Sequence, residues 1–257
     1  MDSGLYAVYT GLAARTQALD TAANNLANAG TSGFRAERDY FRGVLVDGGG
    51  DNAAAASGSS SQVGSSVNGF GVLGGNTLDM SQGELTATGN PLDLALRGDG
   101  FFGVQAAGNK VLYTRNGTFS RSPSGVLQTA QGEPVLDVHG KSLTIPSGTI
   151  RIAPDGTLSV ATDQGSAIVG QIGVFDFPNK SALHAESGGR LSADDAGQPT
   201  AASALMEQGS VEGANQDAVH GTMQLVLVQR QAEMMQKALS VFNNEFDKTA
   251  AEELPKV

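Results

Sequence analysis

The segment near the C-terminus carries the pattern that restricts the fold most. Seven apolar residues follow one another at alternating spacings of three and four: Leu225, Val228, Ala232, Met235, Leu239, Phe242 and Phe246. This heptad pattern sets them along one side of an α-helix and favours contact with a second helix. We therefore predict a helix over residues 215–251, with Asn215 as its N-cap and Asp217 in its first turn.

A second heptad pattern lies near the N-terminus. A leucine recurs every seven residues, at Leu5, Leu12, Leu19 and Leu26, with mostly small residues between. The pattern predicts a helix over residues 3–29, which Gly30 is well placed to end. Because both terminal helices carry a heptad stripe, we expect them to pair as a coiled coil, within one subunit or between subunits.

Between the two helices the pattern is that of short strands. From about residue 76, glycine turns separate short apolar or alternating runs: LDLALR (92–97), FFGVQ (101–105), VLYTR (111–115), LTIP (143–146) and AIVGQIGVFDF (167–177). Short strands with glycine turns are typical of an antiparallel all-β domain. The stretch before them is rich in Gly, Ser and Ala, with too few apolar side chains for a core.

These patterns together predict an α+β protein in four parts. The parts are an N-terminal assembly helix and turn (1–42), a linker (43–75), a central antiparallel all-β domain (76–206) and a C-terminal coiled-coil helix (207–257). The alternative is that both helices cover one face of the β domain. The strict sevenfold spacing favours helix-on-helix contact.

Composition excludes several classes of function. The formal net charge of -10 argues against binding to nucleic acid or to an anionic membrane surface, which both need clustered Lys and Arg. The absence of cysteine excludes disulfides, thiol nucleophiles and Cys-ligated zinc. The first residues do not have the charge and apolar pattern of a secretory signal peptide, and no apolar run is long enough to span a membrane. A cytosolic protein, or export without a cleaved signal, remains compatible with the sequence.

The candidate motifs for catalysis or cofactor binding are weak. Residues 69–74 match G-x-G-x-x-G, but no helical pattern follows, so we interpret them as a glycine-rich turn rather than a dinucleotide site. The three histidines, His139, His184 and His220, are far apart and form no metal-ligand pattern. Asp194 and Asp195 lie in a polar loop, where solvated carboxylates are expected. We predict no enzymatic activity, no cofactor and no metal.

Three asparagines near the end of the N-terminal helix point to a specific contact. Asn24, Asn25 and Asn28 lie in the stretch ANNLANAGTSGF. Asn25 and Asn28 share a helix face with Leu26, and a buried amide without partners is costly. We therefore predict that these amides fix the register of packing against a neighbouring copy. Gly30 and Gly33 then permit a sharp turn.

Several motifs in order along the chain resemble those of bacterial flagellar rod and hook proteins. The first is Ala23-Asn24-Asn25-Leu26-Ala27-Asn28 followed by Thr31-x-Gly33-Phe34-Arg35. Others are Asn90-Pro91-Leu92-Asp93-Leu94-Ala95-Leu96, Gly98-Asp99-Gly100-Phe101-Phe102, Tyr113-Thr114-Arg115-Asn116-Gly117-Thr118-Phe119, Gly125-Val126-Leu127-Gln128-Thr129, Gly132-Glu133-Pro134-Val135-Leu136 and Gln229-Arg230. The length leaves no room for the outer domain of a hook subunit, which favours a rod subunit. The opening MDSGLY and the segment GFRAER favour the proximal over the distal rod.

The resemblance implies a structural subunit of the flagellar basal-body rod, a helical shaft that transmits torque. It implies terminal helices in the core of the tube and the β domain outside. The implied partners are copies of the chain, other rod and hook-family subunits and the flagellar type III export apparatus, with no nucleic acid and no direct membrane insertion. The implied location is the periplasmic rod of the basal body, reached without a cleaved signal peptide.

The predicted assembly interface combines the two stripes with the N-terminal motif. It comprises Leu5, Leu12, Leu19, Asn24, Asn25, Leu26, Asn28, Thr31, Gly33, Phe34, Leu225, Val228, Met235, Leu239, Phe242 and Phe246. Two alternative functions remain at this point. One is a distal rod or hook-type subunit of the same family, and the other is a stand-alone secreted module whose β domain binds a ligand.

Overall fold

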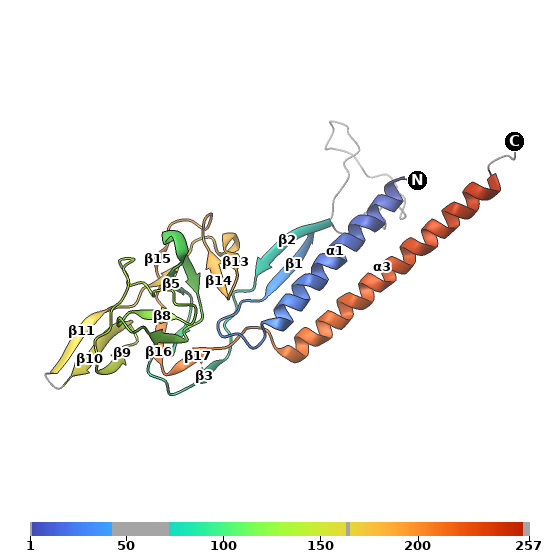
Figure 1. Cartoon of the computed structure of the whole chain (residues 1–257). Helices are drawn as coiled ribbons and strands as arrows, with labels where there is room; N and C mark the ends of the chain where they lie inside the picture. The colour runs from blue at the N-terminus through green and yellow to red at the C-terminus, as the bar shows by residue number, and fades with distance from the viewer. Residues whose placement is uncertain (1, 43–71, 163–164, 254–257) are drawn as a thin grey trace, which may run out of the picture. The chain divides into compact units, whose positions relative to one another are not determined.

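The structure is a computed structural model that describes residues 2–42, 72–162 and 165–253 (Figure 1). The chain divides into two compact units. Unit 1 takes its residues from Met1–Leu26, Glu37–Thr77 and Val219–Val257, and unit 2 from Ala27–Ala36 and Leu78–Ala218. The chain therefore crosses from one unit to the other after Leu26, Ala36, Thr77 and Ala218.

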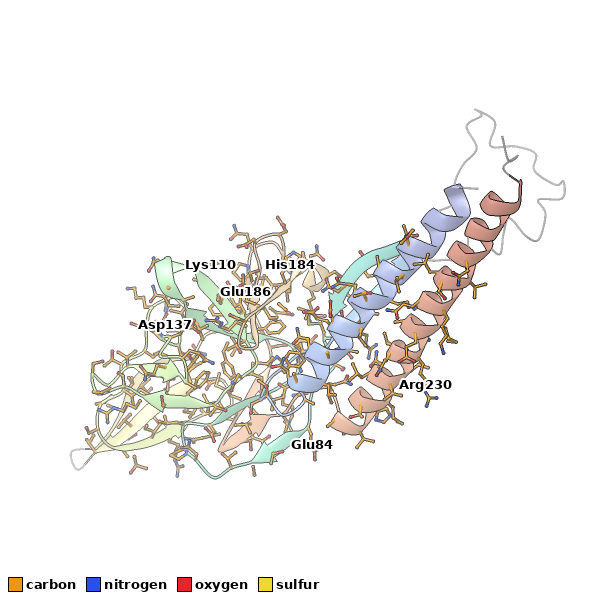
Figure 2. The ribbon with its side chains drawn as sticks, turned by 45° about the vertical axis from the view of Figure 1, so that its right-hand side comes forward. Glu84, Lys110, Asp137, His184, Glu186 and Arg230 are labelled. Carbon is orange, nitrogen blue, oxygen red and sulfur yellow. The ribbon has the colours of Figure 1, made fainter. Side chains whose placement is uncertain are left out.

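Unit 1 contains the two terminal helices, α1 (Asp2–Ala27) and α3 (Ala218–Glu253). They contact each other and run in opposite directions (Figures 1 and 2). With the antiparallel sheets described below, this confirms the predicted α+β fold with paired terminal helices. The helix ends differ from the prediction: residues 28–30 form a turn after α1, and α3 begins at Ala218 rather than at Asn215.

The heptad stripe on α3 is the better-covered side of that helix. Ala232 is buried, and four members of the stripe are half-buried: Leu225, Val228, Met235 and Leu239. Five apolar residues of α3 outside the stripe are more than half exposed: Val219, Met223, Leu227, Met234 and Val241. The side chains of Phe242 and Phe246 lie outside the described residues. The sequence spacing thus identified the covered face of α3.

On α1 the best-covered positions are mostly small residues rather than the leucines. The buried positions include Gly11, Ala14, Ala18, Ala22 and Asn25, whereas Leu12, Leu19 and Leu26 are half-buried. Small side chains let a neighbouring backbone come close, so a stripe of Gly and Ala is covered more completely than long side chains beside it. The side chain of Leu5 lies outside the described residues.

A two-stranded sheet accompanies α1 within unit 1. Its strands are β1 (Glu37–Arg42) and β2 (Val72–Leu78). The hydroxyl of Thr21 on α1 donates to the Asp39 carboxylate on β1 over 3.0 Å. Strand β2 begins inside the segment expected to be a linker, and residues 43–71 of that segment lie outside the described residues.

Unit 2 is built from antiparallel sheets and two 3-10 helices, η1 (Ala107–Asn109) and η2 (Lys180–Ala182). The largest sheet has the order β13-β14-β6-β5-β12-β15, whose bounds in that order are His184–Glu186, Arg190–Ser192, Val111–Thr114, Phe101–Gln105, Val174–Asp176 and Thr200–Ala201. A three-stranded sheet contains β11 (Gly165–Gln171), β10 (Thr157–Thr162) and β9 (Thr149–Ile152). Three strand pairs complete the unit: β16 (Leu205–Gln208) with β4 (Leu94–Arg97), β17 (Ser210–Glu212) with β3 (Leu85–Ala87), and β7 (Phe119–Arg121) with β8 (Leu127–Thr129).

The largest sheet is covered on both faces because its strands send alternate side chains to two apolar clusters. On β5, Phe102 joins the larger cluster and packs edge-on against Phe119, with ring centroids 5.1 Å apart. Its neighbour Phe101 joins the second cluster together with Tyr113 and Phe177. Burial on both faces explains why FFGVQ reads as a continuous apolar run rather than as an alternating one.

Two predicted strands differ in detail. The run AIVGQIGVFDF is split into β11 and β12, which belong to different sheets. The run LTIP forms no strand of its own, although Thr144 makes an isolated bridge with Val126 and both Leu143 and Ile145 are buried in the larger cluster. Its alternating pattern therefore reported burial correctly without a full ladder of hydrogen bonds.

Candidate functional site: an assembly surface and a buried polar junction

The amide of Asn25 is bonded within the chain. Its side-chain nitrogen donates to the carbonyl of Glu37 over 2.8 Å, and its side-chain oxygen accepts from the backbone N–H of Glu37 over 2.9 Å. Asn25 is 3% exposed. An amide bonded twice to one backbone unit acts as a substitute strand neighbour, so Asn25 ties the start of β1 to α1. Its predicted contact with another copy stays a prediction.

We expect Asn25→Ala to destabilise the packing of α1 against β1 by about 1–3 kcal/mol, because the backbone N–H and the backbone carbonyl of Glu37 both lose their side-chain partner. Urea unfolding of the full chain, followed by far-ultraviolet circular dichroism, measures this. Thr16→Ala is the matched control, since Thr16 is exposed and its hydroxyl donates to the carbonyl of Leu12 one turn earlier. Equal stability of the two variants would contradict the role given to Asn25.

Asn24 and Leu26 lie on α1, whereas the motif residues Asn28, Thr31, Gly33 and Phe34 lie in the turn after it, within unit 2. The N–H of Thr31 donates to the carbonyl of Asn28, and the N–H of Phe34 donates to the carbonyl of Thr31. Gly33 has a φ of 70° and is buried, and its N–H donates to the carbonyl of Glu212 over 2.7 Å. A left-handed φ favours glycine because it has no Cβ. The turn therefore brings the N-terminal motif into contact with strand β17.

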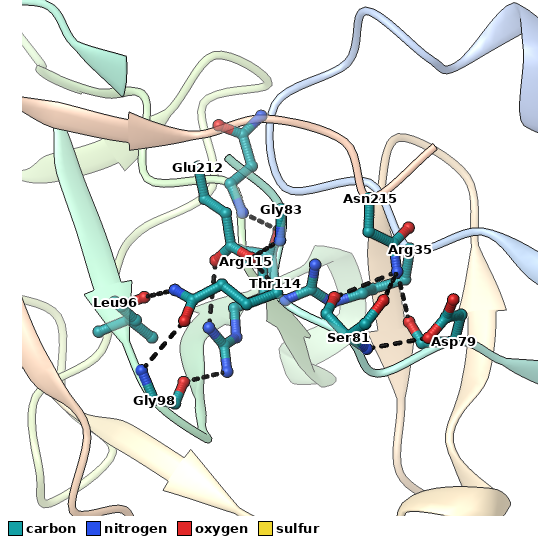
Figure 3. Close-up of polar contacts among 12 residues, drawn as sticks. Arg35, Asp79, Ser81, Gly83, Leu96, Gly98, Thr114, Arg115, Glu212 and Asn215 are labelled. Atoms are coloured by element: carbon teal, nitrogen blue, oxygen red, sulfur yellow. Dashed lines mark hydrogen bonds and ion pairs between the residues drawn. The ribbon is translucent and has the colours of Figure 1, made fainter. Parts of the chain in front are cut away.

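Three charged side chains meet at this contact and are almost fully buried (Figure 3). Arg35 donates to one carboxylate oxygen of Glu212 over 2.7 Å, and Arg115 donates to the other over 3.1 Å. Their side-chain exposures are 2% for Arg35, 4% for Arg115 and 0% for Glu212. One carboxylate therefore compensates two guanidinium groups. Arg35 comes from the turn after α1, Arg115 directly follows β6, and Glu212 ends β17.

Further contacts hold the arginines in place. Arg115 also donates to the carbonyl of Gly98 over 2.6 Å and lies 5.3 Å from the ring centre of Phe101. Burial holds the pKa of the Arg115 guanidinium below its usual value, and the charge of Glu212 opposes this shift. Among the described residues, Arg35 Nε and Nη1 and Arg115 Nε have no hydrogen-bond partner. Glu212 is therefore the main stabilising partner of both charges.

The same carboxylate also orders the segment that leads out of β2. The N–H of Gly83 donates to Glu212 over 2.9 Å. The neighbouring Gln82 donates to the carbonyl of Leu96 and accepts from the N–H of Gly98 (Figure 3). A Cβ at Gly83 would lie 2.2 Å from the carbonyl oxygen of Gly213, so the two backbones approach too closely for a side chain.

Asn215 joins these segments and does not cap α3 as the sequence had suggested. Its side-chain oxygen accepts from the N–H of Ala36 over 2.8 Å. Its side-chain nitrogen donates to the carbonyl of Asp79 over 2.7 Å and to that of Ser81 over 3.2 Å (Figure 3). Its own N–H donates to the carbonyl of Phe34 over 3.3 Å. Asn215 precedes the first residue of α3 by three positions, and Asp217 lies directly before the helix.

The residues that could have served catalysis are exposed and separate. His139 is 76% exposed beside Asp137. Lys110 lies 3.5 Å from Glu186, which Figure 2 labels, and 3.5 Å from Asp194, and all three side chains are largely solvated. Exposed pairs of this kind contribute little to stability. Strand β2 begins at Val72, where a dinucleotide-binding loop would need a helix.

No group of three or more potential metal ligands occurs among the described side chains. No helix in the described part of the chain is long and apolar enough to cross a membrane.

Glu212, Arg115 and Asn215 were not singled out from the sequence as functional. Arg35 and Arg115 stood in the family-like motifs, but Glu212 and Asn215 lie in an ordinary polar stretch. Arg35 and Glu212 are separated by 177 positions. The one available signal was a basic residue at the end of an apolar strand, which requires a counter-charge somewhere in the fold.

Paired terminal helices, a β unit and a buried polar junction that ties distant segments together define a structural protein built for assembly. Comparison with known proteins places it more closely. The family described as "Flagella basal body rod protein" matches residues 5–35, and the family described as "Flagellar hook protein FlgE/F/G D1 domain" matches residues 95–160.

Curated relatives match over almost the whole chain. The chain is 34% identical to the flagellar basal-body rod protein FlgF of Caulobacter vibrioides, over 100% of both chains. It is 36% identical to FlgF of Salmonella typhimurium, over 93% of this chain and 95% of the relative. It is 32% identical to the flagellar basal-body rod protein FlgG of Bacillus subtilis, over 88% and 89%. The chain therefore belongs to the flagellar basal-body rod protein family of FlgF and FlgG, whose members are structural subunits and not enzymes.

Proposed function

We propose that this chain is the FlgF-type, proximal subunit of the basal-body rod. The observation that carries the proposal is the 34% identity to a FlgF over the full length of both chains. The subunit polymerises head-to-tail with copies of itself and with other rod and hook-family subunits; contacts of this type give an open helical shaft when the rotation between subunits does not close a ring. It reaches the periplasm through the flagellar type III export apparatus without a cleaved signal peptide.

In this proposal α3 uses two sides for two contacts. The half-buried stripe of Leu225, Val228, Met235 and Leu239 keeps α3 on α1 within the subunit. The exposed apolar residues Met223, Leu227 and Met234 then meet neighbouring subunits in the shaft. Exposed apolar patches of this kind on a helix support an assembly role because they gain stability when a neighbour covers them.

We expect Met235→Asp to abolish swimming in soft agar and to leave basal bodies without a complete rod. A carboxylate in the covered stripe would have to be desolvated for α3 to pair. Gln236→Asp is the matched control, since Gln236 is exposed and adds the same charge one position away. The genes for the Met235→Asp and Gln236→Asp variants are each expressed in a strain that lacks this chain. Normal motility with Met235→Asp would contradict pairing through the stripe.

The subtype needs a separate measurement. In basal bodies purified from a strain lacking this chain, a proximal subunit predicts that the FlgG-type protein is also missing, because a shaft that grows outward cannot add distal subunits to an absent base. If the chain is instead the distal subunit, the FlgF-type protein stays in those basal bodies. Normal basal bodies and normal motility would favour the stand-alone binding module.

A further inference from the structure

We call the contacts of Arg35, Arg115, Glu212 and Asn215 the polar junction. It lies in unit 2, close in sequence to the points where the chain crosses to unit 1. The chain crosses between unit 1 and unit 2 after Leu26, Ala36, Thr77 and Ala218. Asn215 bonds to Ala36, the last residue before one crossing, and to Asp79, two positions after another. It stands three positions before the start of α3. Asn215 therefore contacts or adjoins the segments at three of the four crossings, those after Ala36, Thr77 and Ala218.

Backbone hydrogen bonds join the same three segments. The N–H of Asp79 donates to the carbonyl of Ala36 over 2.8 Å, and the N–H of Asn215 donates to the carbonyl of Phe34. Phe34, Arg35 and Ala36 are all buried. Every one of these contacts joins residues of unit 2, so none needs α1, α3 or a neighbouring subunit to form.

We propose that this junction is closed in the isolated subunit and that Asn215 is the residue that positions it. The N-terminal motif segment Ala27–Ala36 then folds with the β sheets before assembly, whatever the state of the helices. The segments of unit 2 that lead to α1, β1 and α3 are then already ordered. A neighbour that binds the helices therefore does not have to order the segments that connect them, which lowers the entropic cost of assembly.

The chemistry of Asn215 explains why it suits this position. One amide supplies an acceptor for an N–H and a donor for two carbonyls, all from backbone groups of other segments. Aspartate has nearly the same shape but lacks the donor, and it would set a negative charge against the carbonyls of Asp79 and Ser81. Alanine leaves all three backbone groups without the side-chain partner.

The test is hydrogen–deuterium exchange of the dilute full-length chain, read at single amides. We expect the N–H groups of Gly33, Ala36 and Asp79 to be protected in the isolated protein. In Asn215→Ala we expect their exchange to speed up about tenfold or more, since lost hydrogen bonds allow local opening. The amides of the core strands β5 and β10 should be unchanged. Asn179→Ala is the control, because Asn179 is exposed and makes no cap hydrogen bond.

Three outcomes would overturn the proposal. If Gly33 and Ala36 exchange in the isolated protein as fast as an unfolded chain, the junction is not closed before assembly. If Asn215→Ala leaves their exchange unchanged, Asn215 does not hold the junction. If it speeds exchange equally throughout unit 2, Asn215 contributes only to global stability. Because exchange is measured on the isolated chain, these results do not depend on whether the rod assignment is correct.

A motility assay then tests the consequence for assembly, which rests on the proposed function. We expect Asn215→Ala to impair motility and Asn215→Asp to fail to rescue it, while Asn179→Ala swims normally. An open junction by exchange together with wild-type motility would contradict a positioning role in assembly. Loss of motility in all three variants would contradict the specific role of Asn215.

Discussion

Glu212→Gln should lower the free energy of unfolding of this protein by about 3–5 kcal/mol, although the new side chain has nearly the same size. The carboxylate is fully buried and is bonded to both Arg35 and Arg115. An amide in its place leaves two buried guanidinium groups without a counter-charge, and an uncompensated buried charge is among the costliest changes in a protein. Urea unfolding of the full chain, followed by circular dichroism, measures the loss.

Glu207→Gln is the control for this experiment. Glu207 lies on β16, the strand that precedes β17 in the chain, and forms an exposed ion pair with Arg97. The side-chain exposures are 41% for Glu207 and 66% for Arg97. Its replacement should lower the stability far less than Glu212→Gln does, since water solvates both charges. A second test places Glu212→Gln in an Arg115→Met background, where only one guanidinium loses its partner and the loss should be smaller. Equal losses for the changes at 212 and 207 would contradict the account.

Gly33→Ala should destabilise the turn after α1 by about 2–4 kcal/mol. The left-handed φ of 70° costs an alanine about 1–2 kcal/mol. The added Cβ would lie 2.2 Å from the backbone nitrogen of Asn116 and 2.3 Å from the carbonyl carbon of Arg115, so the backbone must shift as well. Because this shift displaces Arg115, we expect the junction at Glu212 to loosen and motility to be lost.

Two other glycines serve as controls that separate the cost of the left-handed φ from the cost of the steric clash. Gly30→Ala meets nothing within 4 Å and has no left-handed φ, so its stability should change by no more than about 0.5 kcal/mol. Gly132→Ala has a φ of 84° with nothing within 4 Å, so it measures the conformational cost alone. If Gly33→Ala costs no more than Gly132→Ala, the close approach to Asn116 is not a constraint.

The comparison of sequence and structure separates local patterns from long-range ones. The heptad stripes predicted both helices and the covered face of α3, because helix geometry converts sequence spacing directly into a face. The run FFGVQ predicted β5 with its exact limits. The spacing did not determine where α3 begins: Asn215 has the side chain of an N-cap, but its amide bonds to Ala36 in one segment and to Asp79 and Ser81 in another.

The burial of small residues on α1 shows the same limit. The leucines at every seventh position are the obvious apolar residues, yet Ala14, Ala18 and Ala22 are covered more completely. Hydrophobicity alone does not distinguish a position that needs a large side chain from one that needs close backbone approach. Only the packed neighbours decide which is better covered.

The sequence by itself therefore determined the helices, most of the strands, the absence of a catalytic pattern and the family resemblance. Each of these depends on residues close together in the chain or on motifs that can be matched in order. The junction of Arg35, Arg115, Glu212 and Asn215 was decided by the tertiary structure alone. Its members come from segments far apart in sequence, and a charge or an amide gives no sign of its partner until folding removes both from water.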